Sequence, residues 1–469
     1  MGKKFLFRTD ASPVIGTGHV MRCLALAQVL QDVGSSTVFL SATLPEVLRE
    51  RLTREHCDCR TLTSIPYGEQ DAEETAKLGH DIGAEWIVVD GYSFDAAYQD
   101  ALKTAGMKLL FIDDYRHCDH YAADIILNQN VYASENLYNV RGPFTKLLLG
   151  TKYVLLRKEF YNSLSPRLPA RALAKNVLLT LGGFAPTELP ATQRSLEDTG
   201  CTVRVAEGNA NMPSLMQWAD MAISAGGTTA YELAYMGVPT LLLVRAENQT
   251  RVAQGMADAG CAVNLGPIRH IRTEKMTREL LRLLQNAEQC ARMSAAGRRL
   301  VDGEGAGRVA MELMGTRLRV RSIRPNDAEC IWKWANDEET RRASFSSKKI
   351  PWKEHMRWFA ERLADAHTLF LMGLDRDDTP IGYVRFEGKL NEVVLSIAIA
   401  PHRRGQGYGN ELLQQGCQQF FQQRKDAHVS AYVKSGNKGS AVLFQKAGFH
   451  QLAHTTIKDN PALHFILRR

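Results

Sequence analysis

The first 310 residues alternate short apolar runs with amphipathic helical patterns, which is typical of parallel α/β units. The runs that we expect to form buried strands are 5–8, 36–40, 86–90, 108–114, 124–130, 176–183, 221–227 and 240–244. Most of them end in Gly, Asp or Asn, and ligands bind at the carboxyl edge of a parallel sheet. The pattern therefore predicts a doubly wound architecture with a crevice at the strand ends.

The pattern changes at two clusters of helix-breaking residues. The stretch 163–169 contains two prolines and two serines, and the stretch 302–307 contains three glycines. From residue 318 an alternating strand is followed by Pro325 and Asn326 at the start of an amphipathic helix, and then by strands of antiparallel character. We therefore expect an α/β chain of two Rossmann-type lobes, 1–165 and 170–315, followed by an α+β domain, 318–469.

The net charge also changes where the expected α+β domain begins, at residue 318. Residues 1–317 hold 34 Lys and Arg against 35 Asp and Glu, a net charge of −1, whereas residues 318–469 hold 24 against 16, a net charge of +8. A shift of this kind indicates a domain boundary and an anionic partner for the C-terminal part. We expect this partner to be a nucleotide-bearing cosubstrate and not a nucleic acid.

Composition narrows the class of protein further. The 45% hydrophobic and 23% charged residues are ordinary for a globular protein. The first ten residues are too polar for a signal peptide, and no stretch approaches 18 uncharged apolar residues, so we expect a cytoplasmic protein that does not enter a membrane. Nine cysteines scattered through such a chain are expected to be thiols. We predict no metal site.

A glycine-containing loop follows the first predicted strand and leads into a helix. Gly16, Thr17 and Gly18 are followed by His19 in the first helical turn. Glycines allow backbone amides to approach a phosphate or a sugar, and a helix N-terminus favours negative charge. His19 on its own is also compatible with a core or capping histidine.

A second, more specific motif favours a functional role for His19 over a structural one. Gly226, Gly227 and Thr228 lie between a predicted strand and a helix, where they are suited to bind a diphosphate. Glu232, one turn into the helix, is placed to accept hydrogen bonds from both ribose hydroxyls. A Gly-Val-Pro turn at 237–239 and the pair Asn248 and Gln249 complete the motif.

These residues resemble the UDP-binding half of GT-B nucleotide-sugar enzymes. Within that group, residues 8–27 are similar to the UDP-sugar hydrolases of pseudaminic acid biosynthesis, which cleave UDP from a 2,4-diacetamido-2,4,6-trideoxy-β-L-altrose. Further matches are 89–92, 112–114, 128–130, 148–150, 155–157 and 302–303. The resemblance covers about residues 4–310 and implies that His19 is the general base, and that Tyr92, Asn248 and Gln249 contact sugar and phosphates.

One loop departs from this family pattern. Many of these hydrolases carry Gly-Gly-Ser-Asp after the first strand of the second lobe, whereas this chain has Gly-Gly-Phe-Ala at 182–185. Since the loop is expected to contact substrate, the sugar is less well defined by the resemblance than the reaction.

The C-terminal part carries its own pair of motifs. The stretch 401–409 contains Arg403, Arg404, Gly405, Gln406, Gly407, Tyr408 and Gly409 between a strand and a helix, as expected for a pyrophosphate-binding loop. A second segment begins at Asn437 and ends in Gly448 and Phe449. Together they resemble the GCN5-related N-acetyltransferase (GNAT) superfamily over residues 318–469. The resemblance implies a splayed strand that binds the pantetheine arm of acetyl-CoA, which we place at Ile397, Ala398 and Ile399.

One position of the GNAT pattern is altered. Many members carry a Tyr that protonates the departing CoA thiolate, and this chain has Phe444 there. The sequence leaves open whether the domain is fully active.

The two resemblances together predict a bifunctional enzyme with UDP-sugar and acetyl-CoA as its ligands. It would N-acetylate a UDP-4-amino-4,6-dideoxy sugar at C4 and then remove UDP by hydrolysis. The alternative is a GT-B glycosyltransferase whose GNAT domain modifies another acceptor or only binds CoA.

Overall fold

The computed structural model describes residues 2–162, 175–181, 189–206, 210–388, 392–424 and 427–468. The chain forms two compact units, the first made of Met1–Gln31 and Ser35–Ala310 and the second of Asp32–Gly34 and Met311–Arg469. The expected linker at 163–169 and the variant loop at 182–185 lie outside the described residues.

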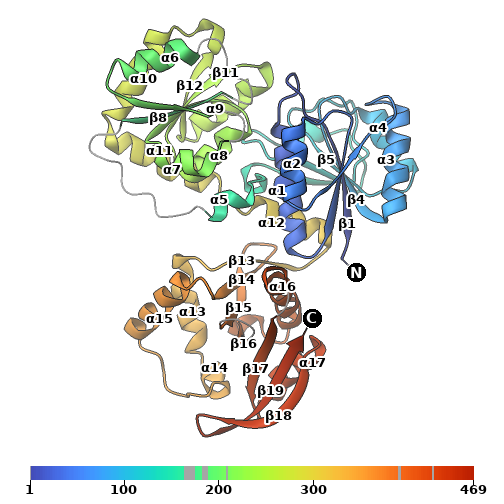
Figure 1. Cartoon of the computed structure of the whole chain (residues 1–469), viewed down its shortest axis with the longest axis vertical. Helices are drawn as coiled ribbons and strands as arrows, with labels where there is room; N and C mark the ends of the chain where they lie inside the picture. Colours follow the sequence, from blue (N-terminus) through green and yellow to red (C-terminus); the bar gives the residue numbers. More distant parts are fainter. Residues whose placement is uncertain are drawn as a thin grey trace. The chain divides into compact units, whose positions relative to one another are not determined.

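The first unit contains two parallel sheets with helices on their faces (Figure 1). The N-terminal sheet has the order β3-β2-β1-β4-β5-β6-β7, and its strands are β1 (Lys4–Thr9), β2 (Ser36–Ser41), β3 (Asp58–Thr61), β4 (Ala84–Asp90), β5 (Leu109–Ile112), β6 (Ile125–Asn128) and β7 (Lys146–Leu149). Its helices are α1 (Gly18–Asp32), α2 (Glu46–Arg54), α3 (Glu69–Ile82), α4 (Ala96–Thr104) and α5 (Lys158–Asn162). β2 and β3 lie on one side of β1, and β4 to β7 lie on the other side. The order in which strands are added therefore reverses between β1 and β4, and α1 begins after β1.

The second sheet has the order β12-β11-β10-β8-β9. Its strands are β8 (Asn176–Thr180), β9 (Thr202–Val205), β10 (Met221–Ala225), β11 (Thr240–Val244) and β12 (Ala262–Pro267). The accompanying helices are α6 (Leu189–Glu197), α7 (Met212–Trp218), α8 (Thr228–Met236), α9 (Thr250–Asp258), α10 (Thr273–Leu284), α11 (Ala287–Leu300) and α12 (Gly305–Met314).

The eight strands predicted for the first unit are present, but four further strands were missed. These are β3, β7, β9 and β12, and each lies at the edge of its sheet. An edge strand is covered on fewer sides than a central one, so its sequence need not be continuously apolar. The sequences DCRT in β3 and TVRV in β9 illustrate this, since most of their side chains are exposed or half-buried.

The second unit is built around a mixed sheet with the order β13-β14-β15-β16-β17-β19-β18. Its strands are β13 (Leu318–Ser322), β14 (Leu369–Asp375), β15 (Pro380–Glu387), β16 (Glu392–Ile399), β17 (His428–Lys434), β18 (His450–Ile457) and β19 (Asn460–Arg468). Its helices are α13 (Ala328–Ala335), α14 (Glu338–Ala343), α15 (Trp352–Ala364), α16 (Tyr408–Gln423) and α17 (Lys438–Lys446). The predicted fold class, two parallel-sheet lobes followed by an α+β domain, is confirmed.

The two faces of this mixed sheet carry separate cores. Val393, Leu395 and Val429 pack against the side of α16 and α17, together with Leu412 and Phe444. The opposite face carries a second cluster with α13 and α15, which includes Ile331, Phe359 and Tyr383.

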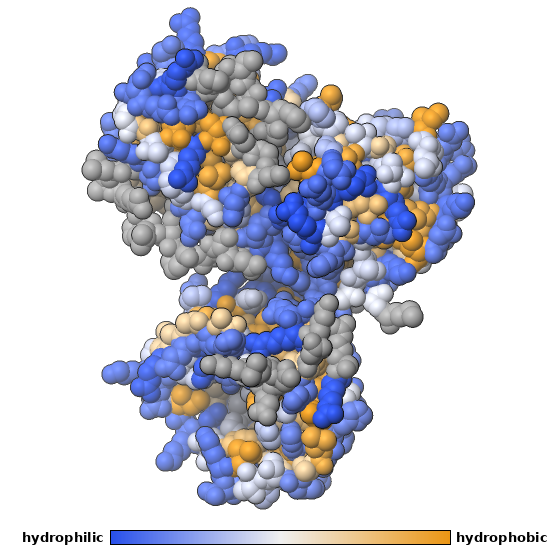
Figure 2. Space-filling view, in the orientation of Figure 1, coloured by the Kyte–Doolittle hydropathy of each residue, from blue (hydrophilic) through white to orange (hydrophobic). Residues whose placement is uncertain are grey.

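The surface seen in Figure 2 is mostly hydrophilic, with hydrophobic residues in small separate groups. Among the described helices, none has both the length and the apolar character needed to cross a bilayer.

Candidate functional site

A tight turn presents His19 at the end of β1. Gly16 donates its amide hydrogen to the Ser12 carbonyl at 2.8 Å, and the Ser12 hydroxyl accepts from the amides of Val14 and Ile15. Gly16 has φ +83°, a left-handed conformation that favours glycine. The turn ends where α1 begins at Gly18, so His19 lies in the first turn of the helix.

His19 is 6% exposed and packs edge-on against the ring of Tyr92, with ring centroids 4.6 Å apart. Burial lowers the pKa of His19, and the Arg22 cation acts in the same direction, against the opposing effect of Asp90. The imidazole is therefore held in its neutral form, which is the form that can accept a proton.

A buried ionic network lies beneath His19. Arg22, one turn further along α1, donates to both carboxylate oxygens of Asp90 at 2.6 Å and to Asp114 at 2.7 Å. Burial alone would raise the pKa of Asp114, but the Arg22 guanidinium and the Tyr92 hydroxyl hold it well below its ordinary value. Tyr92 donates to Asp114 at 2.7 Å, so the network also fixes the ring that contacts His19.

A second charged pair lies behind Tyr92. His117 bonds through Nδ1 to Asp113 at 2.7 Å and through Nε2 to the Phe94 carbonyl at 2.9 Å. Burial would lower the pKa of His117, but the hydrogen bond to Asp113 raises it to about 10. Both partners are acceptors, so His117 carries both ring protons and its ring is held in place.

The two lobes of the first unit meet at this site. A Cβ placed on Gly18 would lie 3.6 Å from the Thr228 hydroxyl, so the first glycine loop approaches the start of α8 closely. Gly227 is the N-cap of α8, and Gly226 has a Cβ position only 3.0 Å from the Gln249 carbonyl. The structure thus brings the two predicted glycine motifs side by side.

Polar contacts also join the two lobes of the first unit at this site. Asn248 donates to the Tyr92 hydroxyl at 3.2 Å, and the Tyr231 hydroxyl bonds to Asn130 at 3.1 Å. The Gln249 side chain accepts from the amide of Arg245 at 3.0 Å and shapes the loop after β11. Tyr92 and, through it, Asn248 therefore lie near His19, and their expected contacts with sugar and phosphates stay a prediction.

Glu232 lies one turn into α8 with its side chain 13% exposed. One of its oxygens accepts from Arg157 at 2.9 Å, and Arg157 also bonds Glu159 at 2.8 Å. Burial raises the pKa of Glu232, and Arg157 opposes this effect. The pairing holds the carboxylate in place and leaves its second oxygen outside the Arg157 contact.

In the second unit, β16 and β17 separate along their length. They pair in parallel only at Glu392–His428, Val393–Val429 and Val394–Ser430, whereas β16 stays paired with β15 as far as Ile399. The edge of β16 that faces β17 is therefore open at Ile397, Ala398 and Ile399. This is the splayed geometry that the resemblance to the acetyltransferases implied.

The glycine loop of the second unit follows β16 and leads into α16. Gly405 and Gly407 have φ +74° and +84°, and Gly407 is the N-cap of α16 ahead of Tyr408 and Gly409. The amides of Gly405, Gln406 and Gly407 have no acceptor among the described backbone groups. Such a turn at a helix start offers amide hydrogens to an anion.

The two arginines of the loop already have acidic partners. Arg403 bonds Asp375 at 2.6 Å, and Arg404 bonds Asp337 at 2.7 Å and Glu339 at 2.8 Å. Their charges are therefore partly compensated, and they brace the loop against β14 and α14. The sequence interpretation missed Arg317, which donates to the Gln406 carbonyl at 3.2 Å and stacks over Tyr408.

The second GNAT segment forms α17. The Asn437 side chain caps this helix by accepting from the amide of Ser440 at 3.0 Å. Phe444 is 4% exposed and packs against Phe449 and Phe465. The position that often carries a proton-donating Tyr is thus an apolar core position here.

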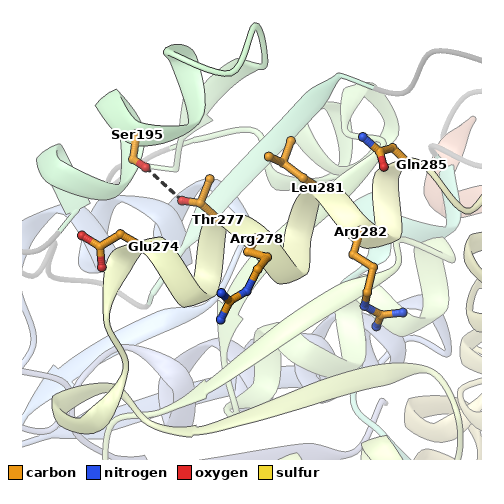
Figure 3. A pocket seen from close by; sticks show the side chains of 7 residues that line it. All are labelled: Ser195, Glu274, Thr277, Arg278, Leu281, Arg282 and Gln285. Atoms are coloured by element: carbon orange, nitrogen blue, oxygen red, sulfur yellow. Dashed lines mark hydrogen bonds between the residues drawn. The ribbon is translucent and has the colours of Figure 1, made fainter.

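A hollow between α6 and α10 contains none of these residues (Figure 3). Its volume is about 470 Å³, and Ser195 and Thr277 at its wall are joined by a hydrogen bond of 3.0 Å. Within the described ranges, no group of three or more His, Cys, Asp and Glu residues is arranged as a metal site.

Sequence reasoning named the motifs but missed how the network under His19 is built. The sequence predicted no role for four residues of this network, although each lies in a segment that matches the family. They are Arg22, Asp90, Asp114 and Asn130. The available signal was Arg22 itself, because a charged residue inside the apolar run of α1 is buried only if it is paired.

Comparison with known protein families matches two parts of the chain. Residues 158–304 match the glycosyltransferase family 28 C-terminal domain, and residues 317–450 match an acetyltransferase (GNAT) domain. The chain thus joins a glycosyltransferase-like domain to an acetyltransferase domain.

Three curated proteins are similar to this chain. An uncharacterised protein of Methanocaldococcus jannaschii is 21% identical and aligns over 76% of this chain and 78% of its own length. The UDP-2,4-diacetamido-2,4,6-trideoxy-β-L-altropyranose hydrolase of Campylobacter jejuni is 26% identical over 46% of this chain and 75% of its own length. The spore coat polysaccharide biosynthesis protein SpsG of Bacillus subtilis is 34% identical over 29% of this chain and 39% of its own length.

Solved structures resemble the second unit. A spermidine N-acetyltransferase from Vibrio cholerae in complex with CoA and spermine is 16% identical, covering 32% of this chain and 95% of that chain with a TM-score of 0.31. An aminoglycoside acetyltransferase in complex with coenzyme A gives 16% identity, the same 32% and 95% coverage and a TM-score of 0.30.

Proposed function

We propose that this chain catalyses two consecutive reactions on one UDP-linked amino sugar. The second unit transfers an acetyl group from acetyl-CoA to the 4-amino group of a UDP-4-amino-4,6-dideoxy sugar. The first unit then hydrolyses the UDP-2,4-diacetamido-2,4,6-trideoxyhexose and releases UDP. This proposal extends the similarity to the Campylobacter jejuni hydrolase to the activity of this chain.

One observation carries the hydrolase part of the proposal. The neutral, buried His19 lies on the glycine loop that approaches the start of α8 at Thr228. A general base and an anion-binding helix start are therefore within one crevice, which is the arrangement needed to attack an anomeric carbon that carries a diphosphate.

In the proposed hydrolysis, His19 removes a proton from a water molecule as its oxygen attacks C1 of the sugar. The bond between C1 and the diphosphate oxygen breaks, and UDP leaves with the electron pair. Amides of Gly227 and Thr228 at the start of α8 stabilise the developing charge, whereas the Gly226 amide donates to the Leu243 carbonyl at 3.2 Å. Attack from the side opposite the diphosphate predicts inversion at C1.

The nucleoside part of the substrate is assigned to Glu232. Arg157 holds this carboxylate by one oxygen, and we assign the ribose hydroxyls to the remaining acceptor positions. Asn248 and Tyr92 meet across the same crevice, where they are placed to contact the sugar and phosphates.

For the acetyl transfer, acetyl-CoA is assigned to the open edge of β16 and the loop that follows it. The pyrophosphate lies at the amides of 405–409, and the pantetheine arm runs along Ile399, Ala398 and Ile397. Metal ions have no part in this proposal.

The test is an assay of the purified full chain with a UDP-2-acetamido-4-amino-2,4,6-trideoxyhexose, with and without acetyl-CoA. We expect free CoA and then free UDP, with UDP release dependent on acetyl-CoA. UDP release only after addition of a lipid acceptor would instead indicate a glycosyltransferase. CoA binding without sugar-dependent CoA release would contradict the acetyltransferase part.

A further inference from the structure

His464 and Ser430 form a polar pair on the face of the mixed sheet that lies opposite α16 and α17. Val429 on β17 and Phe465 on β19 belong to the core under α16, so the alternating residues Ser430, Tyr432 and His464 point to the other side. The Nε2 atom of His464 bonds the Ser430 hydroxyl at 2.9 Å.

Tyr432 completes this cluster. Its ring stacks on the imidazole of His464 with centroids 4.6 Å apart and an interplanar angle of 20°. Tyr432 and His464 are direct cross-strand partners, so the stacking fixes the orientation of the imidazole. His464 is half-buried, and its Nδ1 has no hydrogen-bond partner among the described residues. The ring is therefore oriented and still has a free nitrogen.

The cluster lies where β16 and β17 begin to separate. Val394–Ser430 is their last paired position, so Ser430 marks the closed end of the gap. The pyrophosphate loop follows the opposite end of β16, after Ile399. A cosubstrate that is anchored by its pyrophosphate at this loop and extends back along β16 directs its thioester end toward Ser430 and His464.

We propose that His464, oriented by Ser430 and Tyr432, moves the proton in the acetyl transfer. This assignment rests on the proposed acetyltransferase function of the second unit. The sugar amine attacks the thioester carbonyl carbon and forms the N–C bond, while the proton lost from nitrogen passes to the imidazole. The C–S bond then breaks, and the imidazolium returns the same proton to the CoA sulfur.

This relay accounts for Phe444, at the position where related acetyltransferases often carry a Tyr acid. Phe444 is buried among Phe449 and Phe465 and has no proton to give. A histidine that first accepts a proton and then donates it needs no separate acid, since imidazole changes its protonation state near neutral pH.

The variant H464Q tests the relay in the full-length protein. We expect kcat for sugar-dependent CoA release to fall by about 10²–10⁴-fold, the usual contribution of a general acid–base group. The affinity for CoA measured by calorimetry should not change. The matched control is H454Q, because His454 is an exposed histidine on the neighbouring strand β18 and bears no assigned role.

Two further variants separate catalysis from structure. S430A should lower kcat by about five- to tenfold, since it removes one orienting hydrogen bond. Y432F should retain most activity, since it keeps the ring that stacks on His464.

The outcomes distinguish the relay from the function on which it rests. If wild-type protein binds CoA but releases none with the amino sugar, the acetyltransferase function and the relay are both wrong. If wild-type protein is active and H464Q has the same kcat, only the relay is overturned. If H464Q loses both CoA binding and activity, S430A decides: unchanged kcat with intact CoA binding overturns the relay, and the expected loss supports it.

Discussion

At the scale of single residues, the first unit places a buried ionic network beneath the proposed base. Arg22 is 3% exposed and is balanced by Asp90 and Asp114, so the site contains two carboxylates for one guanidinium. Removing one partner of such a network leaves a buried charge uncompensated, which is strongly destabilising. Tests of mechanism should therefore target His19 itself, which does not belong to this ion-pair network.

His19→Asn should abolish UDP release while UDP binding persists. Asparagine keeps a similar size but cannot accept a proton, so the rate should fall by about 10²–10⁴-fold. Turnover of the acetylated UDP-sugar and calorimetric titration with UDP give the two measurements. His120→Asn is a matched control, because His120 is an exposed histidine paired with Asp100 away from the crevice. Near-normal turnover of the His19 variant would remove this residue from the mechanism.

The pH dependence of hydrolysis follows from the same residue. Burial lowers the pKa of His19 below its ordinary 6.5, so the neutral, base-competent form persists as the solution becomes more acidic. The acidic limb of kcat/KM for UDP release should therefore fall below pH 6.5. A limb above 6.5 that His19→Asn removes would show that the charged form is favoured and would contradict the described environment.

Glu232→Ala should weaken UDP binding. Hydrogen bonds to charged groups contribute about 1.5–3 kcal/mol each, which corresponds to at least a tenfold loss of affinity. Arg157 keeps Glu159 as a partner in this variant, so the fold should persist. Calorimetry with UDP is the measurement, and Glu288→Ala on the exposed surface of α11 is the control. Equal affinities of the two variants would refute the placement of the ribose.

At the scale of elements, the sequence predicted the central strands and helices but not the edges. Central strands such as β10 and β11 are entirely buried, and their continuous apolar runs identify them. The edge strand β3 has the sequence DCRT, which carries neither an apolar run nor a clear alternation. Strand pairing that depends on a neighbour distant in sequence leaves no such local signal.

The functional site shows the same limit. The glycine loops were predictable because left-handed turns such as those at Gly16, Gly405 and Gly407 favour glycine. The pair His464 and Ser430 was not predictable, since it joins residues 34 positions apart on two strands whose register only the fold reveals. The stacking of Tyr432 on His464 was not predictable either, because the two residues become neighbours only through the pairing of β17 with β19.

Gly407→Ala should weaken CoA binding and leave the hydrolysis reaction unchanged. Gly407 has φ +84°, where any other residue is strained, and an added Cβ would lie 3.2 Å from the Arg317 guanidinium, which would have to move slightly. Left-handed backbone costs a non-glycine residue about 1–2 kcal/mol, and we expect CoA affinity to fall by about tenfold. Hydrolysis of an already acetylated UDP-sugar by the same variant is the internal control and should be unchanged. Wild-type CoA affinity would show that this turn does not shape the site.

At the scale of the whole molecule, each unit has hydrophobic clusters of its own. Among the described residues, three such clusters lie within residues 6–301 and two within residues 318–465. Each unit also has its own sheet and its own set of motifs. Tethering two consecutive catalysts raises the local concentration of the second site without requiring a channel between them.

This separation predicts that residues 1–315 alone hydrolyse an already acetylated UDP-sugar at the rate of the full chain. The fragment must include α12, since the Gly305 Cβ position lies 2.3 Å from the Val154 carbonyl, and Arg308 bonds Asp302 and the Lys152 carbonyl. A fragment of residues 1–303 lacks these contacts and should be destabilised, which makes it the matched comparison. Thermal unfolding and UDP release of both fragments provide the measurements. An inactive 1–315 fragment beside an active full chain would show that hydrolysis depends on the acetyltransferase unit, and the two reactions would then have to be treated as one coupled process.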